Sequence, residues 1–472
     1  MKTLIICTAM LASLLISTVR ADMIPDIIST TAVYDVGVHT VALNTVVLPG
    51  AELRLTAGAT VMFMTATSRL VVSGALHAVS ATLTAQSLVT RWGGIVVSDG
   101  ATAQLYQCTL ERAGAFDMEP VTAYRAHCAN SVISNCYATD SARNAFVFEG
   151  GNAVLWDNHA TVTSGNAAFW IKGGGKVVWR STHNTMNGTG FPGIYVDGLF
   201  TDDVEFRTLD GDRLYCNSVI ISNGARIVFP AGAFVGFGFV NSQLELHDGA
   251  RMEAIGTPGA PIVFTDYAEA TNQPNRWAGL HFANATGILT YVTTQRAIGH
   301  TVSDGVLTLS NVCMLGRSGS AIAANRAVVT AYQSEFSGCV GRAVTITNFS
   351  TAFFRECIFR SNNPPYAASF YSDLSTRADV RFCWWNAADG PYPFGAYGNE
   401  LVNTNADAVF FPWLLAAPGS QTNPPYVKIT SQTEPFSTPA AQVIIQGIAT
   451  DATRVVRLAL RNDRCPITHE PS

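Results

Sequence analysis

Short stretches of alternating apolar and polar residues recur along the chain with a period of about 20–25 residues. The clearest three begin at Asn144, Ala167 and Pro192 and align residue for residue as NAFVFEG, AAFWIKG and PGIYVDG. The third and fifth positions are apolar in all three, and the seventh is glycine. Because side chains alternate between the two faces of a β-strand, this pattern predicts three strands that each bury one face and end at a turn. The fourth position then faces outward, and its residues are Val147, Trp170 and Tyr195.

A second strand follows the first in each repeat. Ala153–Trp156 recurs as Lys176–Trp179 with the same step along the chain, and this step places Trp156 and Trp179 on the same face. Farther along the chain, Cys313, Ser334 and Cys357 follow one another at nearly equal steps, which predicts that they share one column. Short β segments that recur about every 20–25 residues predict a solenoid in which each repeat is one coil.

A larger repeat lies over these coils. The segment Val47–Phe63 matches the segment Ile220–Phe237, with Gly50 opposite Gly224 and Phe63 opposite Phe237. The short sequence Arg91–Ile95 likewise matches Arg276–Leu280. The pattern therefore predicts one long solenoid made of two related halves, residues 22–215 and 216–415.

These residues carry a resemblance to a known family. The pattern Val-x-x-Gly-x-x-Leu-x-Leu-x-x-Gly-x-x-Val-x-Phe, followed by Leu-x-Val-x-Gly-x-Leu and Trp-x-Gly-Ile, resembles bacterial right-handed parallel β-helix proteins of the pectin-lyase-like superfamily. Cys383–Pro391 and Phe411–Leu414 are similar to the segments that close such helices. The resemblance implies an all-β fold, a right-handed parallel β-helix, over roughly residues 30–415. It leaves the activity open, because the superfamily includes lyases, hydrolases and non-catalytic surface proteins.

The C-terminal region has a different composition. Residues 416–425 are rich in proline and are expected to form a linker, and Tyr426–Thr430 and Gln442–Thr450 predict strands. Residues 426–472 resemble the start of a bacterial immunoglobulin-like module. Such a sandwich takes about 100 residues, so a short, partial β-sandwich-like tail is expected.

The N-terminus predicts export. Lys2 precedes an apolar run over Leu4–Ile16, which is shorter than the roughly 20 residues that a membrane-spanning helix needs. Val19-Arg20-Ala21 places small residues where a signal peptidase cuts, so residues 1–21 are interpreted as a signal peptide. The mature protein is expected to be secreted, extracellular or on the cell surface, with no transmembrane segment. Without Lys2 and Arg20, 27 of the 29 basic residues remain against 34 acidic ones, which gives a net charge of −7. The basic residues form no stripe, which disfavours nucleic acid or an anionic membrane as a partner.

The sequence offers weak candidates for catalysis. Asp202 and Asp203 are adjacent acids that could divide general acid and base roles, as in polysaccharide hydrolases. Gly299-His300 is similar to part of a Gly-His-Gly element of such hydrolases, but Thr301 replaces the second glycine and no Asn-Thr-Asp or Arg-x-Lys element is present. The alternative, which we favour, is that both aspartates are solvated charges of a loop.

Metal sites are also weakly supported. Asp210 and Asp212 could bind Ca²⁺, but two carboxylates are too few for a dedicated site. Glu149, Lys172 and Asp197 share a column but alternate in sign, which favours a charge ladder over a metal cage. Nine cysteines follow residue 21, with no CxxC pair, so no zinc site is expected and most are interpreted as small buried hydrophobes. No cofactor is therefore expected.

Aromatic residues give the most specific surface hypothesis. Trp170 and Tyr195, with Trp156 and Trp179 nearby, could bind the apolar faces of sugar rings. The alternative, which we favour, is a hydrophobic stack covered by loops. The leading hypothesis is a secreted or cell-surface, non-catalytic β-helix protein that contacts glycans or other cell-surface components. The competing hypothesis is a polysaccharide lyase or glycoside hydrolase of the same fold. The oligomeric state is left open.

Overall fold

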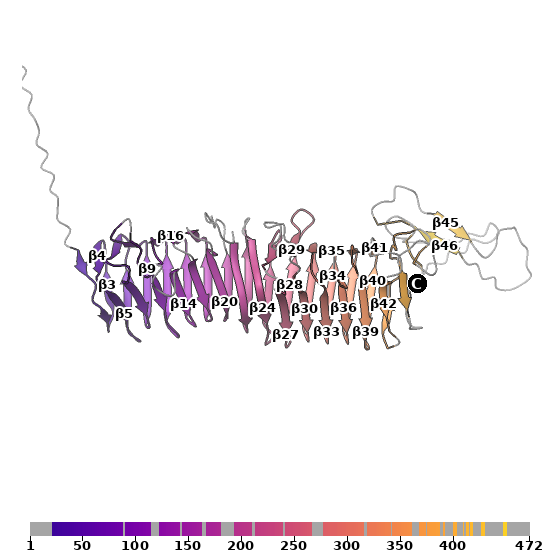
Figure 1. Ribbon diagram of the computed structural model, residues 1–472, viewed down its shortest axis with the longest axis horizontal. Coiled ribbons are helices and arrows are strands. Elements are labelled where there is room, and N and C mark those ends of the chain that lie inside the picture. The colour runs from indigo at the N-terminus through magenta and orange to yellow at the C-terminus, as the bar shows by residue number, and fades with distance from the viewer. Residues whose placement is uncertain are drawn as a thin grey trace, which may run out of the picture.

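The computed structural model describes residues 21–418, with gaps, and two further strands at 426–429 and 447–450. The gaps are residues 88–89, 115–121, 142–143, 163–166, 181–192, 210–212, 239–240, 267–276, 316–318, 341, 361–367, 374, 388–389, 392–399, 404–408, 410–411 and 415. All regular elements in the described residues are β-strands, and those from β1 to β44 stack into a long rod (Figure 1).

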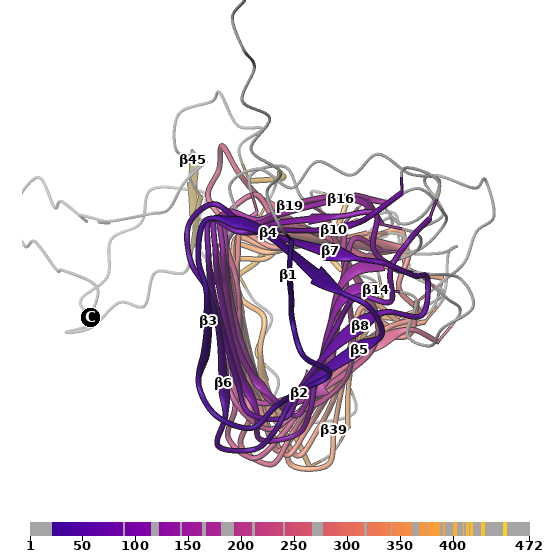
Figure 2. The ribbon, with the colours of Figure 1, turned by 90° about the vertical axis from the view of Figure 1, so that its left-hand side faces the viewer.

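The rod is a right-handed parallel β-helix, as predicted. One coil consists of β7 (Ala59–Phe63), β8 (Arg69–Val72) and β9 (Ala75–Val79). Each of these strands pairs in parallel with its counterpart in the next coil, namely β10 (Thr82–Ala85), β11 (Ile95–Val97) and β12 (Thr102–Tyr106). Viewed along the rod, the three strands of a coil form the three sides of a triangle (Figure 2).

Two of the three walls are simple parallel sheets. Wall A has seven strands: β1 (Asp22–Met23), β4 (Gly37–Val41), β7, β10, β13 (Thr109–Glu111), β16 (Tyr137–Ser141) and β19 (His159–Val162). Wall C has fifteen strands and runs the whole length of the rod: β3 (Ala32–Tyr34), β6 (Glu52–Leu55), β9, β12, β15 (Asn130–Ser134), β18 (Asn152–Trp156), β21 (Val177–Arg180), β23 (Val204–Thr208), β25 (Arg226–Phe229), β28 (Arg251–Ile255), β31 (Thr286–Thr290), β34 (Val306–Ser310), β37 (Val328–Tyr332), β40 (Thr351–Arg355) and β43 (Arg377–Asp379).

Wall B begins as a single sheet and divides in the middle of the rod. Its undivided part contains β2 (Ile27–Ile28), β5 (Asn44–Val47), β8, β11, β14 (Thr122–His127), β17 (Asn144–Glu149), β20 (Phe169–Gly174), β22 (Gly193–Phe200) and β24 (Arg213–Ile221). The long strand β24 pairs with β26 (Phe234–Phe237) through its first half and with β27 (Gln243–His247) through its second.

Two rows of strands continue from this division. The row that starts at β26 goes on through β29 (Ile262–Asp266), β32 (Val292–Gln295), β35 (Cys313–Leu315), β38 (Glu335–Ser337) and β41 (Ile358–Arg360). The row that starts at β27 goes on through β30 (Gly279–Ala283), β33 (His300–Ser303), β36 (Ile322–Asn325), β39 (Val344–Thr347), β42 (Ala368–Ser372) and β44 (Glu400–Asn403). The expected boundary between the halves, at residues 215 and 216, falls inside β24.

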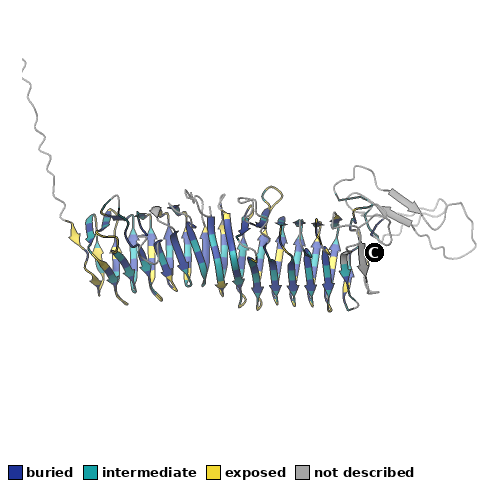
Figure 3. Ribbon diagram, in the orientation of Figure 1, coloured by how far each residue is buried: buried dark blue, intermediate teal, exposed yellow. Residues whose placement is uncertain are grey.

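The core is a set of columns of like residues stacked along the rod. Phe146, Phe169 and Ile194 are register partners on β17, β20 and β22, and all three are buried, as predicted. Phe146 and Phe169 stack with ring centroids 5.0 Å apart and an interplanar angle of 8°. Burying a side chain of this size contributes roughly 1.5–3 kcal/mol before entropy costs, so the columns stabilise the coil stack. Figure 3 shows buried residues alternating with less buried ones along the strands throughout the rod.

A matching buried aromatic stack occurs at equivalent positions of the two halves. Phe63 lies on Trp92 with centroids 3.9 Å apart and an angle of 8°, and Phe237 lies on Trp277 at 4.0 Å and 4°. Each indole N–H donates to a backbone carbonyl oxygen at 2.8 Å, that of Glu111 for Trp92 and that of Gln295 for Trp277. This agreement in three dimensions supports the two-fold repeat inferred from the sequence.

The same turn between strands recurs along the rod, and it accounts for the position of several cysteines. Gln107, Asn135, Glu356 and Phe382 have positive φ angles of 55°, 52°, 53° and 58°, and each precedes a buried cysteine. The thiols of Cys108, Cys136, Cys357 and Cys383 donate to the carbonyl oxygen two residues back, at 3.4, 3.4, 3.3 and 3.7 Å. The hydroxyl of Ser334 makes the same contact at 2.8 Å. These side chains therefore satisfy a backbone carbonyl at the turn.

One predicted column was wrong by a single residue. Cys313 pairs with Glu335, so Cys313 is not in the column of Ser334 and Cys357. The residue in that column is Val312, whose backbone N–H donates to the Ser334 hydroxyl at 3.1 Å. The number of residues from Cys313 to Ser334 is smaller than the number from Ser334 to Cys357. The spacing from Cys313 to Ser334 is one residue shorter than the register of this coil requires.

The C-terminal strands were also predicted in part. β45 (Tyr426–Ile429) and β46 (Gly447–Thr450) form an antiparallel pair within the two stretches that the sequence assigned to strands. Most other residues of 416–472 lie outside the described residues, so the immunoglobulin-like module stays a prediction. In the described part of the chain, we find no helix of the length and apolarity that crossing a membrane requires.

Candidate functional site

The outer face of wall B carries a cluster of aromatic and charged side chains. The register places Arg125, Val147, Trp170 and Tyr195 in one outward column across β14, β17, β20 and β22. His127, Glu149, Lys172 and Asp197 form the next outward column, two residues further along each strand. We call the set Arg125, Glu149, Trp170, Lys172, Tyr195 and Asp197 the Trp170 cluster.

Trp170 is held on three sides. Its ring lies 5.5 Å from that of Tyr195, centroid to centroid, in an edge-to-face arrangement with an angle of 87°. Its indole N–H donates to Oδ1 of Asp197 at 3.1 Å, and Nζ of Lys172 lies 3.9 Å from the ring centroid. An ammonium group over an indole ring contributes about 0.5–1 kcal/mol at an exposed site, so the contact orients both groups.

Glu149 is the anionic centre of the cluster. Its carboxylate accepts from Nε of Arg125 at 2.6 Å and from Nζ of Lys172 at 2.8 Å. Burial acts to raise the pKa of Glu149, but the hydrogen bonds and positive charges of Lys172 and Arg125 outweigh burial and hold that pKa below its ordinary value. Glu149 therefore stays ionised at neutral pH.

Asp197 is shifted in the opposite direction. Burial raises the pKa of Asp197, and the hydrogen bond from Trp170 and the charge of Lys172 offset this only in part. The pKa of Tyr195 is raised to about 12, first by burial and then by the charge of Asp197. Two carboxyl groups two strands apart thus differ in their tendency to carry a proton.

The cluster lies in a partly covered part of the wall. Val147 and Tyr215, the outward residues before and after Trp170 and Tyr195 in their column, are buried, while Trp170 and Tyr195 are intermediate in exposure. The column is therefore neither fully open nor fully covered.

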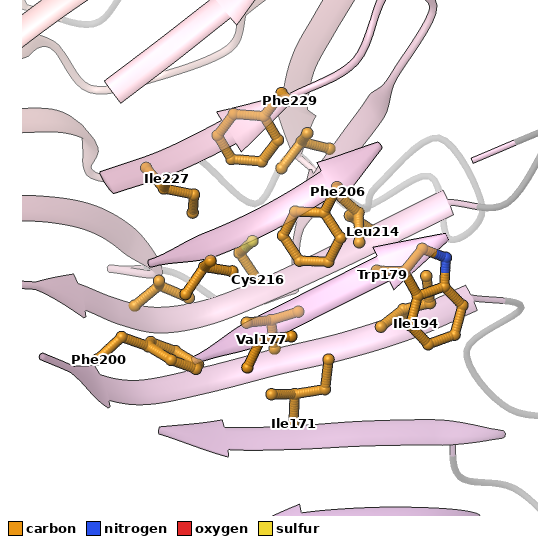
Figure 4. Packing of buried hydrophobic residues seen from close by; sticks show 14 of the residues in the cluster. Ile171, Val177, Trp179, Ile194, Phe200, Phe206, Leu214, Cys216, Ile227 and Phe229 are labelled. Atoms are coloured by element: carbon orange, nitrogen blue, oxygen red, sulfur yellow. The ribbon is translucent and has the colours of Figure 1, made fainter. Parts of the chain in front are cut away.

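Trp156 and Trp179 do not join the cluster. The side chain of Trp156 is on wall C, where it is 39% exposed and pairs with Arg180. Trp179 pairs with Leu155, is 1% exposed, and lies among the core side chains (Figure 4). Its ring is edge-to-face with that of Phe169, with centroids 4.9 Å apart. The prediction that Trp156 and Trp179 share a face, and with it the assignment of Trp179 to a sugar-binding surface, was wrong.

The physical reason is one extra residue in a turn. The step from Ala153 to its partner Val177 is one residue longer than the step from Phe146 to Phe169. The extra residue arises because the three glycines at positions 173–175 replace a two-glycine turn at positions 150 and 151. A one-residue shift moves every side chain of a strand to the other face.

Asp202 and Asp203 lie between β22 and β23, in the loop that the favoured interpretation expected. Asp202 is exposed. Oδ1 of Asp203 accepts from the backbone N–H of Arg226 at 2.9 Å, and its Oδ2 lies 3.9 Å from Nε of Arg226. Asp203 therefore fastens this loop to the start of β25.

His300 lies inside the rod and is 1% exposed. Its Nδ1 accepts from the backbone N–H of Leu280 at 2.9 Å, and its Nε2 is 3.2 Å from the hydroxyl oxygen of Thr294. Its ring centroid lies 5.6 Å from that of Trp277. His300 thus packs and hydrogen-bonds within the core, away from the two aspartates with which the sequence grouped it.

The proposed calcium ligands Asp210 and Asp212 lie outside the described residues. Among the residues that the structure does describe, no group of three or more histidine, cysteine, aspartate or glutamate side chains is arranged to hold a metal ion. The column of Glu149, Lys172 and Asp197 forms as predicted, with Lys172 and Glu149 in an ion pair.

A second outward cluster escaped the sequence analysis. Glu245 on β27 faces His281 on β30, and its Oε2 lies 2.9 Å from Nε2 of His247. Nδ1 of His281 is 2.8 Å from the hydroxyl oxygen of Thr301, and burial lowers the pKa of His281. The step from Glu245 to His281 is much longer than the usual coil period, so counting coils could not pair these two residues.

Comparison of the chain with protein-family models, with curated proteins and with solved structures found no match. The class that the structure defines is therefore the right-handed parallel β-helix, and any activity has to be argued from the side chains themselves.

Proposed function

We propose that this chain is a non-catalytic glycan-binding protein of the cell exterior and that the Trp170 cluster is its binding surface. The observation that carries the proposal is the pair of outward rings of Trp170 and Tyr195, fixed on adjacent strands beside two carboxylates and an ammonium group.

The chemistry of the cluster suits a sugar. Pyranose rings have apolar faces that pack on aromatic side chains, and their hydroxyl groups donate to carboxylates and accept from ammonium and guanidinium groups. Glu149, Asp197, Lys172 and Arg125 lie beside the two rings and supply these partners. A preoriented site loses little side-chain entropy on binding, and here the parallel strands hold each residue at a fixed height.

The location outside the cell is part of the proposal. It is supported by the signal-peptide pattern over residues 1–21. A rod-shaped β-helix also offers a long outer surface for adhesion.

The test is binding of the protein lacking residues 1–21 to a panel of immobilised polysaccharides. Trp170→Ala and Tyr195→Ala together should reduce retention on the bound polymer at least about tenfold, since loss of two aromatic contacts of about 1 kcal/mol or more each exceeds the roughly 1.4 kcal/mol that a factor of ten represents. The matched control is Trp156→Ala, which removes an exposed tryptophan from wall C. Unchanged retention by the double variant, or an equal loss in the control, would contradict the proposal.

Polysaccharide cleavage is the second candidate, and the opposite pKa shifts of Glu149 and Asp197 favour it. Carboxyl groups that differ in this way can serve as base and acid. Their strands are two spacings, or about 9.6 Å, apart, close to the upper limit of separation in inverting glycosidases. The same panel, assayed for unsaturated product by ultraviolet absorbance and for reducing ends with and without Ca²⁺, separates the two functions. Cleavage that Asp197→Asn and Glu149→Gln abolish would replace the non-catalytic proposal by a hydrolase or lyase.

A further inference from the structure

Two pairs of buried cysteines lie on adjacent coils of the rod. Cys108 and Cys136 follow β12 and β15, and Cys357 and Cys383 follow β40 and β43. All four stand at the same corner of the coil, directly after a residue with positive φ. The first pair belongs to the N-terminal half and the second to the C-terminal half.

The members of each pair are neighbours in register. Thr109 pairs with Tyr137, which places Cys108 beside Cys136, and the carbonyl oxygen of Cys108 accepts from the backbone N–H of Tyr137 at 2.8 Å. Ile358 bridges to Trp384, and the carbonyl oxygen of Cys357 accepts from the backbone N–H of Trp384 at 2.8 Å. Adjacent strands lie about 4.8 Å apart, within the Cα separation of about 4.4–6.8 Å that a disulfide spans.

The side chains of each pair also point the same way. The backbone N–H of Cys108 donates to Sγ of Cys136 at 3.4 Å, and each thiol lies at the inner side of its corner. The thiols of Cys357 and Cys383 donate to the carbonyl oxygens of Arg355 and Arg381, equivalent positions one coil apart. Each pair therefore meets in one small part of the core.

The two thiols of each pair also lie within reach of each other. A hydrogen bond with Cys108, and after it burial, raise the pKa of the Cys136 thiol. Burial, and after it a hydrogen bond with Cys357, raise the pKa of the Cys383 thiol. The sulfur atoms of each pair are thus direct neighbours, as the register requires.

The remaining described cysteines differ from these four. Cys216 pairs with Val196 and Phe237, and Cys313 pairs with Thr293 and Glu335, so neither has a cysteine as its register partner. Cys128 is exposed and precedes β15, and Cys339 follows β38. Register thus selects two pairs from the eight described cysteines.

We propose that the protein, when folded in an oxidising compartment, forms the disulfides Cys108–Cys136 and Cys357–Cys383. In each case two thiols lose two protons and two electrons as one S–S bond forms. A disulfide-carrying oxidoreductase or a small-molecule disulfide accepts both and is reduced to two thiols. The inference rests on the export that the proposed function includes, because disulfides persist outside the reducing cytosol.

The two bonds would tie successive coils together. Each closes a loop of one coil, and the second lies in the last coils, beside wall C's final strand β43. Chain ends are the parts of a stacked repeat that open most readily. A covalent link between Cys357 and Cys383 would therefore protect the C-terminal end of the core, where Trp385 stacks on Phe359 at 4.6 Å.

The test compares the same chain made in two compartments. Residues 22–472 are produced in a bacterial cytosol and, behind a standard export signal, in the periplasm, so that the result does not depend on the native leader. Free thiols are alkylated in denaturant, and the unreduced peptides are mapped by mass spectrometry. We expect both cross-linked peptides as the main forms from the periplasm and alkylated thiols at all four positions from the cytosol, with Cys216 and Cys313 alkylated in both.

A variant with an added cysteine tests whether cysteines that are neighbours in register on adjacent coils form the disulfides. Ser334 precedes Cys357 in the same column, so Ser334→Cys should link position 334 to Cys357 at the expense of the Cys357–Cys383 bond in the exported protein. Folded, exported protein with four alkylated thiols would overturn the proposal, and so would disulfides that join other cysteines. Neither result bears on glycan binding, so the two proposals fail separately.

Discussion

Replacing Trp277 by alanine should destabilise the C-terminal half of the rod. The indole is fully buried, stacks on Phe237 at 4.0 Å, contacts His300, and donates to the carbonyl oxygen of Gln295 at 2.8 Å. Truncation of a buried tryptophan costs about 3–5 kcal/mol. Trp277→Phe keeps a ring on Phe237 but leaves the Gln295 carbonyl oxygen without its donor, which costs about 1–3 kcal/mol.

The equivalent substitution in the N-terminal half, Trp92→Ala, is compared with Trp277→Ala. Trp92 makes the same stack and the same hydrogen bond, so Trp92→Ala should cost as much as Trp277→Ala. The exposed Trp156 is the control, and its change to alanine should alter the free energy of unfolding by no more than about 0.5 kcal/mol. Urea unfolding followed by circular dichroism measures the free energy.

Limited proteolysis locates the damage. Because the coils of a solenoid contact only their neighbours, each variant should become sensitive near its own substitution before the other half does. A loss below about 1 kcal/mol for Trp277→Ala would refute the assignment of this stack to the core. So would a Trp277→Phe variant as stable as the unchanged protein.

Three further changes test other parts of the structure. Burial acts to raise the pKa of Asp379, but Arg355 and Arg381 hold that pKa far below its ordinary value. The Asp379 carboxylate therefore stabilises the folded protein above the ordinary aspartate pKa, and this stabilisation is lost as the pH falls below that value. Asp379→Asn should flatten the fall in unfolding free energy between about pH 5 and about pH 2. Gly279 has φ of +127°, and an added Cβ would overlap the carbonyl oxygen of Gly299, so Gly279→Ala should cost more than about 2 kcal/mol in thermal or urea unfolding, whereas Gly259→Ala, with no atom within 4 Å, should be nearly neutral. Lys172→Met removes a hydrogen bond and a positive charge from Glu149, so NMR titration of the Glu149 carboxyl should show a higher pKa, and an unchanged value would contradict the assigned ion pair.

The coil period could be predicted because the inward residues of adjacent coils are chemically alike. Phe146, Phe169 and Ile194 reveal the repeat, and the same spacing correctly predicted that Glu149, Lys172 and Asp197 form a column. The adjacency of Trp170 and Tyr195 followed directly from it. What the period could not give is how far neighbouring segments cover these side chains.

Other parts depended on details that the spacing hides. Three consecutive glycines at residues 173–175 lengthen one turn by a single residue and turn Trp179 into the core. A histidine after a glycine resembled a catalytic motif, yet His300 is enclosed because Trp277 and Thr294 belong to coils that pack around it. The division of wall B at β24 was not anticipated, although the alternation of that strand breaks there: three buried residues, Leu214–Cys216, precede two half-buried ones, Asn217 and Ser218.

Wall C determines how the rod would respond to a pulling force. Its fifteen strands lie side by side, so their interstrand hydrogen bonds point along the rod, and a force that pulls the chain out from one end loads only the bonds of the outermost coil. Outside the coils that the two proposed disulfides would close, the rod would therefore unwind one coil at a time, releasing about 20–25 residues or roughly 80 Å of extended chain per step. Such a rod would lengthen in small increments under load and leave the remaining coils, with any surface they carry, intact.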